Sequence, residues 1–313
     1  MEDKDFVRDP VADVYNLIVE DLLKAISDLK GIVQASVYRA NETAARALLS
    51  RVYLYMGEWE KCDSQCDTIM QATYRLQDLN TLKSGTSILS SKSTETIFSQ
   101  GEYRLNAMVG YKTKTTYAIS EDLKAAFYNQ ANDQRYKLGI TIYSYGNYPS
   151  KFKKWSNGGV SDCNLIRYAE IYLNKAEALA MLNRDGDAKT ELEKLRSKRF
   201  AAAPSVTETG EALIDFIRDE RRRELCFEGH RWFDLRRYAV NSIHPLPDNF
   251  TIRHRNNAYE ANSRTWYENG YYELNAYTQD RAAWIIPIPN YAIEFNRGEL
   301  QNEIRPNREL QRD

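Results

Sequence analysis

The sequence has few of the residues that dominate metal-binding, disulfide-rich and membrane-spanning proteins. Four cysteines and three histidines in 313 residues are too few for a disulfide scaffold in a chain of this length. No apolar run approaches the roughly 18–20 residues that a membrane-spanning helix needs. The 43 basic residues are balanced by 44 acidic ones, so no overall basic field favours nucleic acid as a partner. What remains is a globular composition with enough chain to bury a core.

The two cysteines that lie close in sequence do not indicate a metal site. Cys62 and Cys66 are four residues apart in a predicted helix and therefore share a face. A zinc site needs further ligands, and the chain offers only His230, His244 and His254. Small residues at such positions are also typical of tetratricopeptide-like helices, where they let neighbours approach closely. We expect packing roles for both cysteines, and neither a metal nor a cofactor.

Helical periodicity predicts a scaffold of paired helices. Residues 10–29 form an amphipathic pattern. Residues 42–56 form a second helix, ended by Gly57 and followed by a partner helix from Glu58 to about Met70. A second pair is expected over roughly 165–182 and 185–198, around Gly186. Both turns have tetratricopeptide-like chemistry, but they lie much further apart than the ~34-residue period of a tandem array.

Two other stretches differ in character from these helices. Residues 84–162 are rich in Ser, Thr, Gly, Asn and Tyr, with short strands predicted at 96–100 and 139–145 and a short helix at 121–130. Residues 241–284 form a second irregular, aromatic-rich stretch. We therefore predict a mainly α fold with tetratricopeptide-like pairs, long irregular loops and a few short strands. One domain over 1–313 is expected, with its helical scaffold in 10–70 and 165–240 and irregular excursions in 84–162 and 241–284.

Residues 216–238 carry the most informative pattern in the chain. Apolar residues recur at helical positions in the first half, at Phe216, Ile217, Leu225 and Phe227. Gly229 follows, where a left-handed residue would end the helix. The apolar pattern then resumes at Trp232, Phe233 and Leu235. The chain is therefore expected to turn at Gly229 and enter a second packed helix.

The amino-acid sequence around this turn is more distinctive than a helix hairpin requires. Glu228-Gly229-His230-Arg231-Trp232-Phe233-Asp234 follows directly on Arg221-Arg222-Arg223-Glu224. This string closely resembles the C-terminal signature of the SusD/RagB-like family, the surface glycan-binding lipoproteins that sit on TonB-dependent transporters. Residues 10–29, 165–178 and 285–302 resemble further family segments in the same order. The match departs at Ala292, usually acidic, and after Asn302, where Glu303-Ile304-Arg305 replaces the usual Pro-Gly.

The resemblance implies a SusD-like fold and a binding function without catalysis. The implied ligand is an oligosaccharide or polysaccharide, the implied partner is a SusC-like TonB-dependent transporter, and the implied location is the surface of the outer membrane. Family members usually begin with a signal peptide, a lipidated Cys and a further helical stretch. This chain opens Met1-Glu2-Asp3-Lys4-Asp5, with no Cys before Cys62. An N-terminal truncation relative to the family is therefore expected.

Tyrosine is the compositional anomaly, with 22 Tyr against 10 Phe. Tyr suits half-wet surfaces, because its ring is apolar and its tip is polar. Sugars present the same mixture, with C–H faces and hydroxyl groups. The candidate ligand-binding rings are Tyr143, Tyr145, Tyr148 and Trp155, which lie near Gly146 and several Asn and Lys donors. The alternative is that these rings pack the loops onto the helices.

The signature is interpreted as structural. Glu228, Arg231 and Asp234 are three residues apart across the helix junction, which suits capping and ion pairing around Gly229. Arg231 is expected to be buried and paired with Glu228 or Asp234, and Trp232 and Phe233 are expected to bury against the 165–182 helix.

Two other functions compete with glycan binding. A tetratricopeptide-like protein- or peptide-interaction module is the main alternative. A glycoside hydrolase would share the substrate class, but it needs a pair of carboxylates in a cleft, and no spacing in the sequence singles out such a pair.

Overall fold

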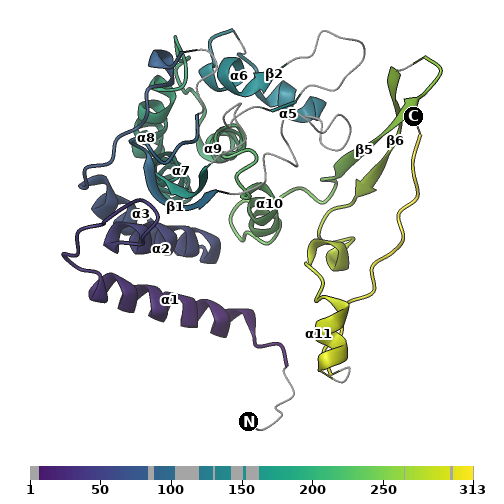
Figure 1. Ribbon diagram of the computed structural model, residues 1–313, viewed down its shortest axis with the longest axis horizontal. Helices are drawn as coiled ribbons and strands as arrows, with labels where there is room; N and C mark the ends of the chain where they lie inside the picture. The colour runs from purple at the N-terminus through teal and green to yellow at the C-terminus, as the bar shows by residue number, and fades with distance from the viewer. Residues whose placement is uncertain are drawn as a thin grey trace. The chain divides into compact units, whose positions relative to one another are not determined.

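The computed structural model describes residues 7–83, 88–102, 120–129, 131–141, 151–152, 162–263, 265–296 and 299–312. Its helices are α1 (Val11–Asp28), α2 (Glu42–Met56), α3 (Trp59–Met70), α5 (Glu121–Ala126), α6 (Gln134–Gly139), α7 (Tyr168–Met181), α8 (Asp185–Ser197), α9 (Gly210–Glu224), α10 (Arg231–Ala239) and α11 (Asn290–Phe295), with 3-10 turns η1 (Leu79–Thr81) and η2 (Arg281–Trp284). The strands are β1 (Thr96–Glu102), β2 (Ile140–Thr141), β3 (Lys151–Phe152), β4 (Asp162–Arg167), β5 (Ile252–Glu260) and β6 (Thr265–Leu274). The predicted mainly helical class is confirmed (Figure 1).

The chain divides into two compact units. The larger unit is Val19–Asp234, and the smaller unit combines Met1–Ile18 with Leu235–Asp313. Helices α1 and α10 each begin in one unit and end in the other. The expectation of a single domain over 1–313 stays a prediction.

The first predicted helix pair, α2 and α3, has the turn that its sequence indicated. Asn41 precedes α2 in an extended conformation, and its side-chain oxygen accepts a hydrogen bond from the Ala44 N–H at 2.8 Å. Gly57 ends the helix with φ 79°. The N–H of Glu58 then donates to the Tyr53 carbonyl at 2.9 Å, which closes the last turn.

The second pair, α7 and α8, turns at a different residue from the one predicted. Asn183 has φ 59°, whereas Gly186 lies inside the first turn of α8. Asn is among the few residues that adopt the left-handed region at modest cost. The Arg184 N–H donates to the Leu179 carbonyl at 2.9 Å and completes the turn. The pair was predicted correctly, but its glycine is not the turning residue.

Helix α7 is the central element of the larger unit. It packs against α2, α3, α8 and α9, and nearly all its residues are buried. The polar side chains that it buries are paired, as for Lys175, whose Nζ lies 2.6 Å from a carboxylate oxygen of Asp63 on α3. Cys62 and Cys66 are fully buried in the same core. The Cys62 thiol lies 3.7 Å from the Asn174 carbonyl oxygen, which places it in helix packing.

Two small antiparallel sheets belong to the larger unit. Strand β1 pairs with β4, with Thr96 opposite Arg167 and Glu102 opposite Asp162, and β2 pairs with β3. The strand predicted at 96–100 is confirmed by β1. Of the strand predicted at 139–145, the described part is Ile140–Thr141. The predicted helix at 121–130 forms over Glu121–Ala126.

The smaller unit contains a long hairpin where the sequence predicted irregular structure. Strands β5 and β6 pair antiparallel from Ile252↔Leu274 to Glu260↔Thr265. The prediction was wrong here because β5 is mostly Arg, His and Asn, and its side chains are exposed or half-buried along its length. Such a strand lacks the alternation of apolar and polar residues by which strands are identified.

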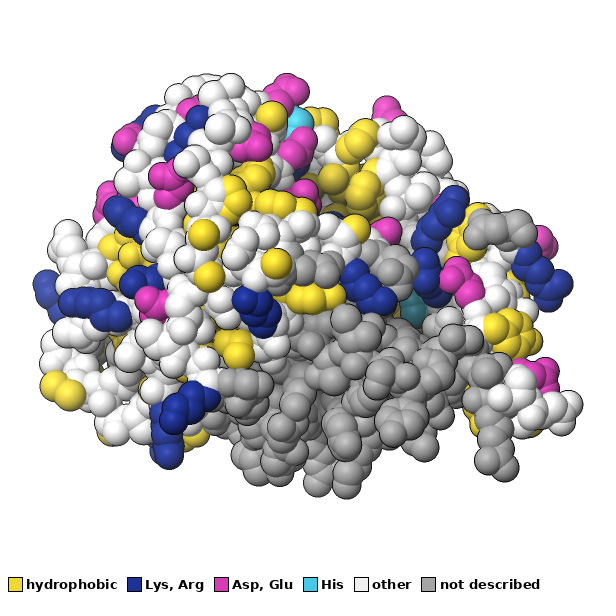
Figure 2. All heavy atoms as spheres, turned by 90° about the horizontal axis from the view of Figure 1, so that it is seen from above, with side chains coloured by type: hydrophobic (Ala, Val, Ile, Leu, Met, Phe, Trp, Pro, Cys, Tyr) yellow, Lys and Arg dark blue, Asp and Glu magenta, His cyan; other side chains and the backbone are white. Residues whose placement is uncertain are grey.

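The predicted helix over 10–29 is confirmed by α1, but its apolar residues are unevenly buried. Ile26 is buried, whereas Val11 is 71% and Leu17 58% exposed. Among the described residues, no helix combines the length and apolar character needed to cross a bilayer. On the face shown in Figure 2, basic, acidic and hydrophobic side chains are interspersed over the described surface.

Candidate functional site

The signature begins with a helix end that differs from the expected one. Helix α9 ends at Glu224 and does not continue through Phe227. Both Phe227 (φ 61°) and Gly229 (φ 84°) are left-handed, so the chain turns twice before α10. The terminal carbonyl of Glu224 accepts a hydrogen bond from Arg167 Nη2 at 2.8 Å. That arginine satisfies a group that another helical turn would otherwise have satisfied.

A left-handed Phe is unusual and needs support from its surroundings. The Phe227 side chain packs against a small apolar cluster of Leu89, Leu123, Phe127 and Cys226. Gly229, as predicted, adopts the left-handed conformation without a side-chain penalty. The double turn therefore combines one residue held by packing with one that is conformationally permissive.

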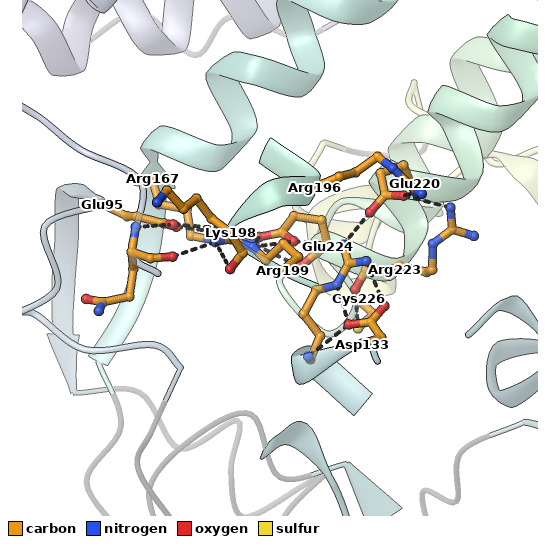
Figure 3. Close-up of polar contacts among 12 residues, drawn as sticks. Glu95, Asp133, Arg167, Arg196, Lys198, Arg199, Glu220, Arg223, Glu224 and Cys226 are labelled. Atoms are coloured by element: carbon orange, nitrogen blue, oxygen red, sulfur yellow. Dashed lines mark hydrogen bonds and ion pairs between the residues drawn. The ribbon is translucent and has the colours of Figure 1, made fainter. Parts of the chain in front are cut away.

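Three arginines from separate elements converge on the Glu224 carboxylate. Two of them, Arg167 and Arg199, are labelled in Figure 3. Arg167 Nη1 lies 2.6 Å from it, Arg199 Nε 2.9 Å, and Arg135 Nη1 3.0 Å. All four side chains are at most 3% exposed. The end of α9 is thereby tied to β4, to the chain following α8, and to α6.

Glu220, one turn earlier on α9, is the second centre of this network. Its carboxylate lies 2.5 Å from Arg135 Nη1, 2.7 Å from Arg196 Nη1 and 2.9 Å from Arg223 Nη2. Figure 3 shows Arg196, Glu220 and Arg223 beside Glu224. Arg135 contacts both carboxylates. The third carboxylate, Glu95 before β1, lies 2.6 Å from Arg199 and 3.1 Å from Arg167.

The arginine charges set the ionisation of the carboxylates in this network. Burial opposes ionisation of Glu220, but the charges of Arg135, Arg223 and Arg196 outweigh it and hold its pKa well below its ordinary value. The same balance, with Arg199, Arg167 and Arg135, holds the pKa of Glu224 well below its usual range. Both groups are ionised at any physiological pH. They are therefore unsuited to donating protons as general acids.

A second cluster ties the start of α10 to α7 and α9. Arg221 Nε donates to the Asp234 carboxylate at 2.9 Å, and its Nη1 donates to the Asn174 amide oxygen at 2.7 Å. Glu170 on α7 accepts from Arg51 at 2.6 Å. Despite complete burial, the charge of Arg51 lowers the pKa of Glu170 to about 2.

His230 lies in the same cluster and carries no charge at neutral pH. Burial lowers its pKa to about 4, although the charge of Glu170 acts in the opposite direction. A neutral, enclosed imidazole fits a packing role between the two helices.

The other signature residues lie as follows. Glu228 pairs with Arg167, whose Nε lies 2.7 Å from it, and Asp234 pairs with Arg221. Arg231 and Trp232 are half-buried, which is less than expected. Phe233 is 48% exposed, so its predicted burial was wrong. Helix α10 directs Asp234 toward Arg221. The side chain of Phe233, one residue earlier, therefore projects about 100° away around the helix.

The predicted ligand-binding rings, Tyr143, Tyr145, Tyr148 and Trp155, all lie outside the described residues. Their role stays a prediction. Among described tyrosines on the hairpin, Tyr259 and Tyr267 are 47% and 49% exposed. Tyr259 stands opposite Trp266 and Tyr267 opposite Ala258 in the register, so the two rings lie on opposite faces of the hairpin.

A pocket of about 430 Å³ lies in the smaller unit, beside the open end of the hairpin. Two cross-strand pairs on one face of the hairpin line it: Ile252 with Leu274, and His254 with Tyr272. Glu273, the C-terminal segment 305–308 and Ala283 of η2 complete the lining. An aliphatic surface, one phenol ring and several side-chain donors therefore meet in one concavity.

The C-terminal segment is anchored to the hairpin by specific contacts. Tyr271 and Gln311 exchange two backbone hydrogen bonds of 2.9 Å. Their approach requires Gly270, at φ 118°, because a Cβ there would lie 2.1 Å from the Gln311 carbonyl oxygen. Arg308 Nη1 donates to the Glu273 carbonyl at 2.5 Å, and Arg308 also pairs with Asp280. Figure 1 shows this segment returning along β6 toward the C-terminus.

Sequence reasoning missed the pocket because its lining comes from distant positions and a strand that was not predicted. One signal in the sequence was Gly270, which precedes the adjacent tyrosines Tyr271 and Tyr272. An isolated glycine in a strand marks a place where another backbone segment approaches closely.

Comparison with known proteins identifies the family. The family model for the SusD family matches residues 52–304. The chain belongs to the SusD family. Starch-binding protein SusD of Bacteroides thetaiotaomicron is 28% identical over 206 residues, which are 62% of this chain and 33% of that protein. SusD-like protein P38 of Formosa agariphila is 37% identical over 110 residues, 31% of this chain and 22% of that protein. The chain thus matches a third or less of the length of these relatives.

Solved structures agree with the fold. A SusD superfamily protein from Bacteroides vulgatus superposes with a TM-score of 0.73 at 21% identity, covering 97% of this chain and 68% of the other. A SusD-like carbohydrate binding protein from the same species gives a TM-score of 0.66 at 19% identity, covering 92% and 65%. The SusD-like fold predicted from the sequence is confirmed.

Proposed function

We propose that this chain binds oligosaccharides or polysaccharides without cleaving them. The observation that carries the proposal is the SusD family match over residues 52–304, together with the starch-binding relative. The ionised, arginine-paired carboxylates of α9 are poor general acids, because protonating them would leave buried arginine charge unpaired. The rigid scaffold that they form is suited to holding loops in a fixed arrangement.

Capture at the outer-membrane surface, for uptake through a SusC-like TonB-dependent transporter, is the cellular role that we propose from family membership. Among the described residues, no observation favours the alternative of a tetratricopeptide-like interaction module, whose helix pairs here serve as a packed core.

We propose that rings in the 143–155 stretch, above all Tyr145 and Trp155, supply part of the sugar-contacting surface. Affinity electrophoresis of the full chain against plant, host and microbial polysaccharides tests the function. Retardation by at least one polysaccharide is expected, with no new reducing ends released on incubation. Absence of retardation across the panel, or release of reducing ends, would overturn the proposal.

Two variants test the location of the contact. Trp155→Ala and Tyr145→Ala should weaken retardation by the cognate polysaccharide and leave the melting temperature nearly unchanged. Tyr291→Ala, which removes an exposed ring from α11, outside both aromatic stretches, is the matched control. Normal retardation of both 143–155 variants would show that the sugar-contacting surface lies elsewhere. The 259–277 stretch would then be tested next.

A further inference from the structure

We propose that the pocket beside the β5–β6 hairpin binds an anionic sugar residue, one carrying a carboxylate or a sulfate ester. This inference rests on the proposed function, because it assigns a substrate class to a glycan-binding protein. It concerns a site separate in sequence from the 143–155 rings. The argument depends on the shape of the pocket, the pairing of its charges and the placement of one arginine.

The shape of the pocket suits one or two sugar rings. Its volume of about 430 Å³ falls in the range of small-molecule sites. Ile252 and Leu274 provide aliphatic surface, and Tyr272 adds a half-buried ring. Such surfaces contact the C–H faces of a pyranose, while Asn307 and His254 offer side-chain hydrogen-bonding groups at the rim.

The acidic residue that lines the pocket and the one that contacts Arg308 are already paired. Glu273, which lines it, lies 3.0 Å from Arg253 Nε. Asp280 pairs with Arg308. Within each pair, the arginine and the carboxylate neutralise each other's charge. The charge of Arg305, which also lines the pocket, has no such counterpart, since no ion pair to it exists within the described ranges of the chain.

Arg305 is held in place by neutral groups. Its Nε donates to the Ala282 carbonyl at 3.2 Å, and its Nη2 donates to the Ile285 carbonyl. A guanidinium has five N–H groups in a fixed fork, so donors remain beyond those that anchor it. Carbonyl anchoring orients the group without cancelling its charge. This combination suits recognition of a planar carboxylate or of sulfate oxygens.

The test is isothermal titration of the full chain with three probes: an oligogalacturonide, a sulfated galactan oligosaccharide and a neutral galacto-oligosaccharide. Wild type should bind at least one anionic probe more tightly than the neutral one, and more weakly as salt is added. Arg305→Gln should lower that affinity roughly tenfold. Arg312→Gln, on the same exposed segment but outside the pocket lining, makes the same charge change and should bind as wild type.

The two anionic probes separate the possible sources of charge. Preference for the oligogalacturonide assigns a uronic acid, and preference for the galactan assigns a sulfate ester. If wild type binds a neutral glycan but neither anionic probe, the inference is overturned and glycan binding stands. Equal loss by both arginine variants, or by Arg305→Gln for all three probes, would also overturn it. Failure of wild type on these probes and on the whole polysaccharide panel overturns both proposals.

Discussion

Arginine is used in opposite ways in the two units of this protein. In the larger unit, Arg135, Arg167 and Arg199 are buried and surround carboxylates at hydrogen-bond distance. In the smaller unit, Arg305 is exposed and held by backbone carbonyls. A buried charge must be fully paired, because removing one partner leaves the other uncompensated. An exposed one is free of that constraint and remains available to a ligand.

The buried and the exposed arginines therefore have different roles. The buried network joins the segment before β1 to β4, α6, α8 and α9 around the end of one helix, and it therefore fixes the scaffold. The exposed arginine stabilises little, because solvent already satisfies it. Substitutions in the two units should therefore separate stability from binding.

The largest effect is expected at the centre of the network. Glu224→Gln removes the charge that three buried arginines share, and should lower the free energy of unfolding by roughly 3–5 kcal/mol. Urea denaturation followed by circular dichroism measures it. Asp219→Asn, an exposed position on the same helix, is the control and should stay within about 0.5 kcal/mol of wild type. A Glu224→Gln protein as stable as this control would remove the distinction between the units.

Acidification should weaken the larger unit through His230 and Glu170. Burial lowers the pKa of His230 from 6.5 to about 4. As pH falls, His230 is therefore protonated in the unfolded chain before it is protonated in the folded one. The free energy of unfolding decreases between these two pKa values. The pKa of Glu170 is lowered from 4.5 to about 2. Its contribution, on the order of 3 kcal/mol, is complete above the unfolded value and is lost as pH falls toward 2.

Urea midpoints measured between about pH 8 and pH 3 test this dependence. His230→Asn should remove the decline in the His230 interval and keep the one at lower pH. His254→Asn, at an exposed histidine, should leave the wild-type profile unchanged. A wild-type midpoint that stays flat below about pH 6 would show that these groups are not ionised as described.

The helix pairs could be predicted from the sequence, whereas the long-range ion pairs and one local element, the β5–β6 hairpin, could not. The turn at Gly57 could be predicted because a helical pattern over 42–56 is followed at once by a glycine. The pairing of Arg199 with Glu224 and Glu95 joins residues 25 and 104 positions apart, and no local spacing indicates such a pairing. The hairpin was missed because β5 carries polar residues where a strand pattern needs alternating apolar ones.

A smaller effect is expected where the C-terminal segment meets the hairpin. Gly270→Ala should displace Gln311, because the new Cβ would collide with its carbonyl oxygen, and should cost about 1–3 kcal/mol of local stability. Hydrogen exchange at Tyr271 and Gln311 would detect the opening. Gly186→Ala, where the added Cβ meets nothing within 4 Å and the backbone is helical, should be neutral or slightly stabilising. Unchanged protection in Gly270→Ala would show that the segment is not held this way.

The smallest effect on stability should accompany the largest effect on anionic ligands. Arg305→Gln is expected to change the free energy of unfolding by less than about 0.5 kcal/mol, because its anchors are two exposed carbonyl contacts. Arg199→Gln should cost several times more, since it leaves Glu224 and Glu95 each short of a buried partner. Urea denaturation of the two variants, in parallel with the anionic-probe titrations, compares one side chain in two settings. If Arg305→Gln destabilised the protein as much as Arg199→Gln, its role would be structural, and the pocket would lose the group that distinguishes it as an anion site.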